Sequence, residues 1–457
     1  MKEDIEQGKY KLVKIFDKLR VKIVDTVEAD VPDSVFLNIN DREAYMGILS
    51  DGEYKFAKSP DLEDALALLQ LHTRAIADTE TVSLTECTGR VLAEDIVSPH
   101  DQPPFPRSPL DGYAFRAEDT AGASEGSPAY LKVVAEVDAG DCYEGSVGHG
   151  EAVRIMTGAP IPDGADAVAG QEDTDLGENT VGIKYEFSPY QNYCHRGEDY
   201  KKGTILLHDR EPIGPVETGI ISSAGKNTVK VYRRPRILLI STGDEVVAPG
   251  QELQKGKIYN SNLYTLHAQL KMWNADVTET LHSGDDADHL AEIINSRIDD
   301  VDMVITSGGV SVGKKDILHD VYSILGVDTL VRNIRIKPGM AMLAGTYKDK
   351  LMLSLSGNPY AAYTGLHMIG RPVIEAMAGC KRPSIQRMKA VLMNDYTKAS
   401  PTRRFVRARV VDGEAYIEGH TGGNGDIYSG HETTALVEIP AGSGPLKAGT
   451  TVTVIMV

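Results

Sequence analysis

The stretch MVITSGGVSVGKKD, residues 303–316, decides the fold class of this chain. Its opening apolar run has counterparts in RILLIS (236–241) and KLMLSL (350–355). Short, nearly continuous apolar runs are typical of strands that are buried on both faces of a parallel sheet. Segments with helical spacing alternate with these runs: LYTLHAQLKMW, DADHLAEIINSRI, DILHDVYSIL and PYAAYTGLHMIGRPVIEAMAG. The alternation predicts a βαβ domain over residues 233–380 with a mostly parallel sheet.

The same stretch comes close to a nucleotide-binding P-loop. From Gly308 it reads G-x-x-x-x-G-K-K, one residue short of the pattern G-x-x-x-x-G-K-[ST]. The last position is Lys315, which has no hydroxyl group to bind Mg²⁺, and the carboxylate of Asp316 follows it. The sequence therefore disfavours a P-loop NTPase and favours a different ligand loop.

The regions around this domain have other patterns. Residues 1–57 predict a small α+β extension, including a hairpin in GILSDGEYKF, and contain no recognisable chemistry. From about 84 to 232, short strands separated by Gly, Pro and Asp predict a β-rich region. Strands return after the βαβ domain, with an Asp-Gly hairpin in ARVVDGEAYIE, so residues 381–457 are expected to form a small β-barrel or sandwich.

Composition limits the classes of function. The 48 lysines and arginines against 66 aspartates and glutamates give a formal net charge of −18, which argues against nucleic-acid binding. The four cysteines form no C-x-x-C pair and are expected to be reduced, mostly buried thiols. No run is long and apolar enough for a membrane span, and the N-terminus has no signal-like segment. The cytoplasm is the expected compartment.

Ligands of an open parallel sheet bind beyond the carboxyl ends of its strands. Three loops follow the apolar runs, STGDEV (241–246), SGGVSVGKKD (307–316) and SGNPYAA (356–362). Each begins with small residues, which allow close approach of a ligand to the backbone. Asn358 as N-cap and Pro359 as the first helical residue would present a helix N-terminus to an anion. Each loop alone is also compatible with an ordinary strand-to-helix turn.

Carboxylates cluster at these strand ends. They are Asp244, Glu245, Asp285, Asp286 and Asp316. Hard oxygen ligands beside phosphate loops suit Mg²⁺, although acidic residues after strands are often helix caps, an alternative that stays open for Asp286. No two histidines have the spacing of a zinc site, so we do not expect zinc.

Loops of the β-rich region also carry isolated polar residues between prolines and glycines. PPFPRSPLDGYAF (103–115) contains Asp111, VRIMTGAPIPDGADAVAGQEDT (153–174) contains Thr157, and HRGEDYKKG (195–203) contains Asp199. Such stiffened loops are compatible with ordinary turns or with a preorganised pocket. Their spacing does not name a ligand.

The chain resembles the molybdenum insertases, the MoeA-type molybdopterin molybdotransferase family that includes the E domain of gephyrin. The resemblance begins near residue 58 and rests on motifs in the family's order: SPLDGYAF, RIMTGAPIPDGADAV, RGEDYKKG, RRPRILLISTGDEV, IYNSN, DMVITSGGVSVGKKD, IKPG and SGNP. It implies an elongated homodimer with four subdomains per chain. These are an elongated linker or dimerisation subdomain (58–110 with 200–232), a β-rich subdomain (111–199), a βαβ domain similar to molybdopterin adenylyltransferase (233–380) and a C-terminal β-barrel-like domain (381–457).

The resemblance also implies the reaction, in which adenylylated molybdopterin and molybdate give molybdenum cofactor and AMP with the help of Mg²⁺. Transient contact with molybdopterin adenylyltransferase and with target molybdoenzymes is implied as well. Four residues match functional or catalytic positions: Asp111, Thr157, Asp199 and Glu245. Metal positions match Asp285, Asp316 and Glu245. Cofactor-binding positions match Ser307, Gly308, Gly309, Ser311, Gly313, Lys337, Ser356, Gly357, Asn358 and Pro359.

Several residues depart from the family pattern. Leu110 replaces the usual methionine before DGYA, Met340 replaces the second lysine of KPGKP and is followed by Ala341 rather than proline, and Ser356 replaces the first proline of PGNP. Losing a lysine beside a phosphate site removes a positive charge. Met340 and the extra N-terminal segment (1–57) favour a second hypothesis, a non-catalytic carrier or scaffold that binds finished cofactor. A third hypothesis is the adenylylation step itself. Molybdate and tungstate are not distinguished by the sequence, because both are tetrahedral oxyanions.

Overall fold

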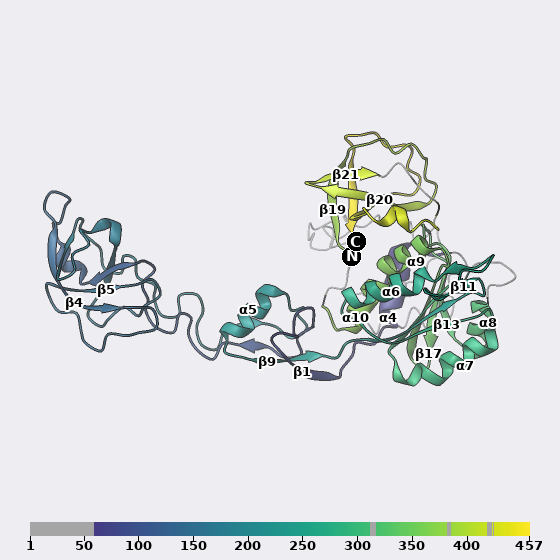
Figure 1. The fold of residues 1–457 in the computed structure, drawn as a ribbon, viewed down its shortest axis with the longest axis horizontal. Helices are drawn as coiled ribbons and strands as arrows, with labels where there is room; N and C mark the ends of the chain where they lie inside the picture. The colour runs from purple at the N-terminus through teal and green to yellow at the C-terminus, as the bar shows by residue number, and fades with distance from the viewer. Residues whose placement is uncertain (1–58, 311–316, 382–384, 418–422, 424) are drawn as a thin grey trace, which may run out of the picture. The chain divides into compact units, whose positions relative to one another are not determined.

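The computed structural model describes residues 59–457 except 311–316, 382–384, 418–422 and 424 (Figure 1). The α+β extension predicted for residues 1–57 lies outside the described residues.

A six-stranded mixed sheet forms the centre of the βαβ domain. Its order is β13-β10-β14-β18-β17-β15, in which the first four strands are parallel, β17 runs antiparallel to both of its neighbours, and β15 runs in the same direction as the first four. The three apolar runs of the sequence are the adjacent strands β10, β14 and β18, and all five residues of β14 are buried. The predicted, mostly parallel sheet is therefore confirmed. The strands are β10 (Arg236–Thr242), β13 (Asp276–Ser283), β14 (Met303–Ser307), β15 (Asp328–Arg332), β17 (Met342–Tyr347) and β18 (Lys350–Leu355).

Helices cover both faces of this sheet. On one face α7 and α8 pack on alternate residues of β10, with Leu238 and Ile240 in a shared apolar cluster. On the other face lie α6, α9, α10 and the N-terminal α4 (Figure 1). The helices are α4 (Leu62–Leu71), α6 (Ser261–Met272), α7 (Ala287–Arg297), α8 (Leu318–Leu325), α9 (Pro359–Gly365) and α10 (Arg371–Met377), with a 3₁₀ turn η4 (Ile298–Asp300).

The last predicted helix of this domain is interrupted. Between α9 and α10 the chain forms a π-helical segment, η5 (Leu366–Gly370). Pro372 lies in the first turn of α10 and has no backbone N–H to donate, so the regular hydrogen-bond ladder cannot continue across it. The segment places His367 in a buried position between α6 and the C-terminal strand β23 (Thr451–Met456).

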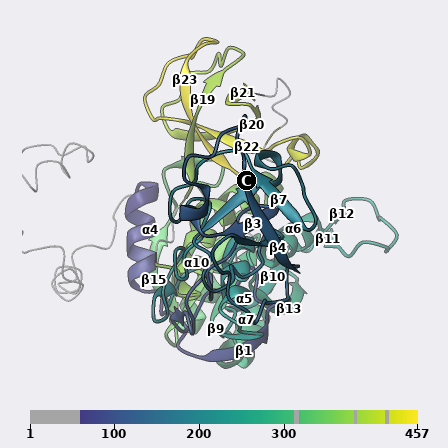
Figure 2. The same cartoon turned by 90° about the vertical axis from the view of Figure 1, so that its left-hand side faces the viewer.

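The C-terminal region is a closed barrel, which decides between the two predicted architectures. The ring β20-β21-β19-β23-β22 closes because β22 also pairs with β20 (Figure 2). The predicted Asp-Gly hairpin joins β20 to β21, with positive φ angles of 50° at Asp412 and 80° at Gly413, as a type I′ turn requires. The elements are β16 (Ile336–Lys337), β19 (Arg387–Leu392), β20 (Arg403–Val411), β21 (Glu414–Ile417), η6 (Tyr428–Gly430), β22 (Ala435–Ile439) and β23.

Ion pairs connect this barrel to the start of α4. Arg403 donates to Glu63 Oε2 at 2.6 Å and to Glu438 Oε1 at 2.7 Å, and Arg387 also contacts both carboxylates. The Glu438 side chain is 10% exposed, so its charge depends on these two guanidinium groups for compensation.

The β-rich region contains a five-stranded sheet with an apolar cluster on each face. Its order is β6-β3-β5-β4-β7. Its elements are β3 (Gly112–Phe115), η2 (Ala117–Thr120), β4 (Ala129–Val137), β5 (Glu151–Ile155), β6 (Ala167–Gly170), η3 (Gln171–Asp173) and β7 (Thr180–Ile183).

Chain segments before and after this sheet pair with each other. β1 pairs with β9, and β2 pairs with β8. Buried residues of β2, β8, β9 and α5 form one apolar cluster. The elements are β1 (Thr79–Ser83), β2 (Ile96–Val97), β8 (Ile205–Leu207), α5 (Pro215–Ser223) and β9 (Thr228–Tyr232).

The four cysteines are free, as predicted, but the expectation that most are buried is wrong. Only Cys87 is buried, while Cys142 is exposed and the other two are partly exposed. Among the described residues, the helices are all too short or too polar to span a bilayer.

Candidate functional site

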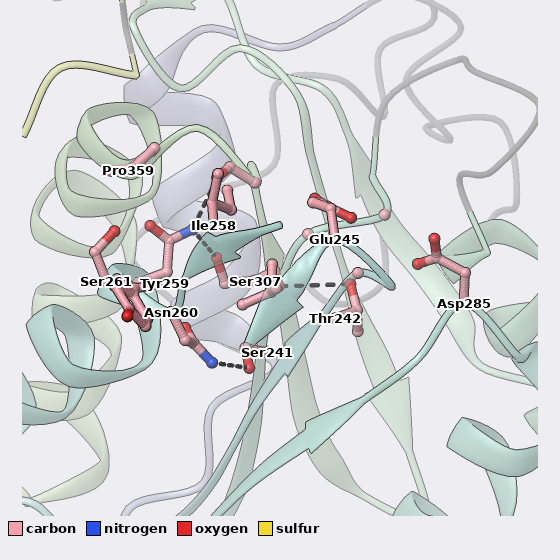
Figure 3. Close-up of a pocket in the computed structure, with 16 residues that line it drawn as sticks. Ser241, Thr242, Glu245, Ile258, Tyr259, Asn260, Ser261, Asp285, Ser307 and Pro359 are labelled. Carbon is pink, nitrogen blue, oxygen red and sulfur yellow. Dashed lines mark hydrogen bonds between the residues drawn. The ribbon is translucent and has the colours of Figure 1, made fainter. Parts of the chain in front are cut away.

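A pocket of about 280 Å³ lies at the carboxyl ends of β10 and β14 (Figure 3). Its walls also include the turn after β18, the start of α6 and the short parallel pair β11 (Val246–Val247) and β12 (Ile258–Tyr259). This is the edge where the parallel order of β10, β14 and β18 brings the three predicted loops together.

Glycines allow these loops to approach each other closely. Gly308 has a φ of +110°, and a Cβ there would lie 2.8 Å from the carbonyl oxygen of Thr242. A Cβ on Gly357 would lie 3.4 Å from the Cα of Gly308. Thr242 after β10, Gly308 after β14 and Gly357 after β18 therefore lie close together, and a side chain at position 308 would disrupt this approach.

Asn262 joins two of these loops. Its Nδ2 donates to Ser307 Oγ at 2.8 Å and to the carbonyl oxygen of Gly357 at 2.9 Å. Ser307 Oγ in turn donates to the carbonyl oxygen of Ser356 at 3.2 Å. One amide on α6 therefore holds the end of β14 at Ser307 against the turn after β18 at Gly357.

Asn260 fixes the start of the helix that carries Asn262. Its Oδ1 accepts from the N–H of Leu263 at 3.0 Å, and its Nδ2 donates to Ser241 Oγ at 2.6 Å (Figure 3). Neither asparagine was among the predicted site residues. The motif IYNSN contained the signal, because an Asn directly before a helix is a common N-cap.

Two of the predicted acidic residues line the pocket. Glu245 and Asp285 lie on its Thr242 side (Figure 3). The N–H of Asp285 donates to Asp244 Oδ1 at 3.0 Å, so the loops after β10 and β13 hold each other. Asp286 is a helix cap instead, since its Oδ1 accepts from the N–H of His289 at 3.0 Å. Asp316, together with Ser311 and Gly313, lies outside the described residues.

The turn after β18 contributes Gly357 and Pro359 to the pocket wall. Asn358 occupies the N-cap position of α9, although its side chain makes no capping hydrogen bond. Ser356 is buried, and its Oγ accepts from the N–H of Asn358 at 3.2 Å. A proline at this position would keep the carbonyl that Ser307 contacts but would lose this hydroxyl.

Lys337 lies apart from the pocket wall. It is exposed at the end of β16, before the cis peptide bond to Pro338. Met340, at the position where the family commonly has a lysine, is also exposed. Neither side chain belongs to the described residues that line the pocket, so a ligand role for Lys337 stays a prediction.

The β-rich sheet brings two other predicted residues into contact. Gly112 is paired with Ile155 in β3 and β5, so Asp111 and Thr157 lie next to each other at the ends of these strands. Asp111 Oδ1 accepts from the hydroxyl of Thr157 at 2.6 Å and from its N–H at 2.7 Å. These two hydrogen bonds lower the pKa of the Asp111 carboxyl, because they favour its charged form.

Asp199 is not part of this contact. It lies on the loop that follows the Arg107–Cys194 bridge, where its N–H donates to the carbonyl oxygen of Gln102 at 2.9 Å. An ion pair between Arg196 and Asp101, with 2.7 Å between Nε and Oδ2, holds the same loop. The Asp111–Thr157 contact and the loop of Asp199 therefore both involve the segment 101–111.

Comparison with known proteins gives matches over the three regions of the fold. The model of the MoeA N-terminal region (domain I and II) matches residues 61–225. The "Probable molybdopterin binding domain" matches residues 238–376, and the MoeA C-terminal region (domain IV) matches residues 389–457.

Similar whole chains include the molybdopterin molybdenumtransferase of Staphylococcus aureus (strain COL), which is 35% identical over 379 residues, or 82% of this chain and 90% of the relative. The same-named protein of Staphylococcus epidermidis (strain ATCC 12228 / FDA PCI 1200) is 35% identical over 378 residues, with the same coverage of both chains. Among solved structures, the molybdopterin biosynthesis moeA protein from Pyrococcus horikoshii OT3 matches with a TM-score of 0.76 and 29% identity. The match covers 88% of this chain and 100% of that one.

Proposed function

Since this chain belongs to the MoeA family of molybdopterin molybdenumtransferases, we propose that it inserts molybdate or tungstate into adenylylated molybdopterin and releases AMP. The reaction would be a step of molybdenum cofactor biosynthesis. The observation that carries the proposal is the pocket at the carboxyl ends of β10 and β14, within the region that matches a molybdopterin-binding domain.

The pocket suits a ligand with phosphate groups. Gly308, Gly309 and Gly357 leave their backbones accessible, so main-chain groups can approach phosphate oxygens closely. The hydroxyls of Ser307 and Thr242 and the amide of Asn262 add side-chain hydrogen-bonding groups. The residues proposed to bind the pterin nucleotide are those of the predicted set: Ser307, Gly308, Gly309, Ser311, Gly313, Lys337, Ser356, Gly357, Asn358 and Pro359.

The acidic side of the pocket suits Mg²⁺. Glu245 and Asp285 offer carboxylate oxygens, and Mg²⁺ sites of this kind need only one or two carboxylates because waters and substrate phosphates complete the coordination. We assign these two residues, with Asp316, as the metal ligands. When bound, Mg²⁺ would supply positive charge to the phosphoanhydride oxygens. The chain itself would orient the nucleotide and exclude water around it.

The residues of the β-rich region are proposed to act from a second copy of the chain. Asp111, Thr157 and Asp199 are polar residues on loops that belong to a different part of the fold from the pocket. We infer a cytoplasmic homodimer in which these loops face the pocket of the partner subunit. The hydrogen bonds from Thr157 keep Asp111 charged, which suits the positioning of a cationic or protic group rather than proton donation.

The carrier hypothesis has weaker support. Met340 motivated it, but this residue is not part of the described pocket wall, and the relatives bear the name of a transferase. The adenylylation hypothesis is also disfavoured, because the matches extend over the N-terminal and C-terminal regions as well as the βαβ domain.

The test is an AMP-release assay with the full-length protein, adenylylated molybdopterin, Mg²⁺ and either oxyanion. We expect AMP and active cofactor, and competition between molybdate and tungstate reports the preference. Glu245→Gln should lose most turnover, whereas Glu252→Gln, an exposed residue outside the pocket wall, should retain it. Cofactor binding without AMP release would replace the proposal with the carrier hypothesis.

A further inference from the structure

Three potential metal ligands meet at the end of the β-rich sheet that lies away from Asp111 and Thr157. Glu118 and Asp119 belong to η2, which follows β3, and His149 precedes β5. One ligand atom of each lies within 4.8 Å of the others. The antiparallel pairing of β3 and β5, with Phe115 opposite Ala152, brings the two chain segments together.

Asp119 is the member of this cluster with a buried side chain, and one of its oxygens is paired with His149. Its side chain is 1% exposed. Oδ2 accepts from the N–H of Gly150 at 2.9 Å, whereas Oδ1 has no regular hydrogen bond and its one recorded contact is an ion pair with Nδ1 of His149. When Nδ1 of His149 carries no proton, this buried carboxylate oxygen has no donor, which is costly, and its lone pairs repel those of the imidazole nitrogen. A cation between these two atoms would remove both costs.

Glu118 can supply the third ligand with little loss. It is exposed, and its Oε1 lies 2.6 Å from Nη2 of Arg116, which is itself 40% exposed. Exposed ion pairs of this kind contribute about 0–1 kcal/mol. The second carboxylate oxygen of Glu118 remains available to a metal, and the exposed His149 ring has room to adjust.

We propose that Glu118, Asp119 and His149 form a binding site for a divalent transition-metal ion of the zinc class. One imidazole nitrogen and two carboxylate oxygens suit Zn²⁺ or Co²⁺ better than Mg²⁺ or Ca²⁺, which prefer oxygen ligands alone. Water would fill the remaining positions, because His149 and Glu118 are open to solvent. The ion would join η2 to the segment before β5 and so stabilise the strand pair whose other end holds Asp111 and Thr157. This site is independent of the proposed catalytic function.

The experiment is a Zn²⁺ titration of the full-length protein after removal of metals with a chelator. Excess Mg²⁺ is present throughout, so that the hard-oxygen site of the strand-end pocket is occupied. We expect the wild type to bind one Zn²⁺ at this site and to gain thermal stability. Co²⁺ should give the absorption bands of a site with a nitrogen ligand.

Two variants and one matched control decide the outcome. His149→Ala and Asp119→Asn should each lose this one bound ion and the gain in thermal stability, and circular dichroism checks that they fold. His208→Ala is the control, because His208 pairs with Asp95 at 3.8 Å but belongs to no three-ligand cluster in the described chain. The proposal is overturned if the wild type binds no Zn²⁺ beyond the His149→Ala level, or if the control loses as much as the variants.

Discussion

His367 should make the free energy of unfolding depend on pH between about 4 and 6.5. Its ring is 3% exposed, with Nε2 3.1 Å from the carbonyl oxygen of Met456 and Nδ1 3.3 Å from Nε2 of Gln269. Nδ1 therefore accepts and Nε2 donates, so the neutral ring satisfies both neighbours. Burial, together with the charge of Arg371, lowers the pKa of His367 from 6.5 to about 4, although the contact with Met456 opposes the shift.

The sign and size of the effect follow from this shift. Between pH 6.5 and about 4 the unfolded chain protonates this histidine while the folded chain does not, so stability falls as the pH falls through that window. Each pH unit is worth about 1.4 kcal/mol, so lowering the pH from about 7.5 to about 5 should cost about 2 kcal/mol. Replacement by glutamine removes the titrating group and this part of the loss.

Trp273 makes the measurement direct. It is the only tryptophan of the chain, and its ring centroid lies 5.5 Å from that of His367. Denaturant unfolding followed by its fluorescence should show that the stability difference between wild type and His367→Gln narrows by about 2 kcal/mol from about pH 7.5 to about pH 5. The other histidines are present in both proteins, so their contributions cancel. A difference that stays constant with pH would refute the reasoning, because His367 would then titrate alike in both states.

Three further substitutions test the pocket and the barrel contacts. Gly308→Ala should abolish AMP release in a folded protein, because alanine at this positive φ is strained by about 1–3 kcal/mol and its Cβ would press on the Thr242 carbonyl. Normal turnover of this variant would contradict the close approach of Gly308 to Thr242. Asn262→Ala should raise the Kd for adenylylated molybdopterin about tenfold, equivalent to about 1.4 kcal/mol, because it removes the hydrogen bonds that hold Ser307 and Gly357 together. Titration calorimetry that shows an unchanged Kd would exclude this positioning role of Asn262. Arg403→Met should destabilise the barrel by about 2 kcal/mol, because Glu438 then keeps only one guanidinium partner. Hydrogen exchange of the backbone amides in β20 and β22 measures this loss. Unchanged protection of these amides would show that the ion pairs contribute little.

The elements that the sequence predicted well are those with a local cause. The buried strands β10, β14 and β18 are apolar in nearly every residue, and Asp412-Gly413 suits the type I′ turn that joins its two strands. Strand-end loops could be located because parallel strands all point their carboxyl ends to one edge. These features need no information about distant parts of the chain.

The features that were missed depend on contacts between distant segments. Asn262 and Ser307 are 45 residues apart, and nothing local in the helix start indicates which loops the amide would join. The cluster of Asp119 and His149 arises only from strand pairing, so a search for histidine pairs could not find it. The π-helical segment before Pro372 was hidden for a different reason, because its apolar residues also fit a regular buried helix.

The hydrogen bonds of Asn262 have a consequence for how the pocket binds. Ser307 at the end of β14 and the turn at Ser356 and Gly357 after β18 are fixed to each other by protein groups alone, so this part of the wall is preorganised and needs little ordering when a ligand arrives. The acidic side differs, because Glu245 and Asp285 bring two carboxylates to the same pocket, and the phosphates of the proposed ligand would need positive charge beside them. Shape selection and charge compensation are thus divided between two walls of one pocket. Contacts made by the wall of Ser307 and Gly357 should therefore persist without divalent cations, while contacts at the acidic wall should need them.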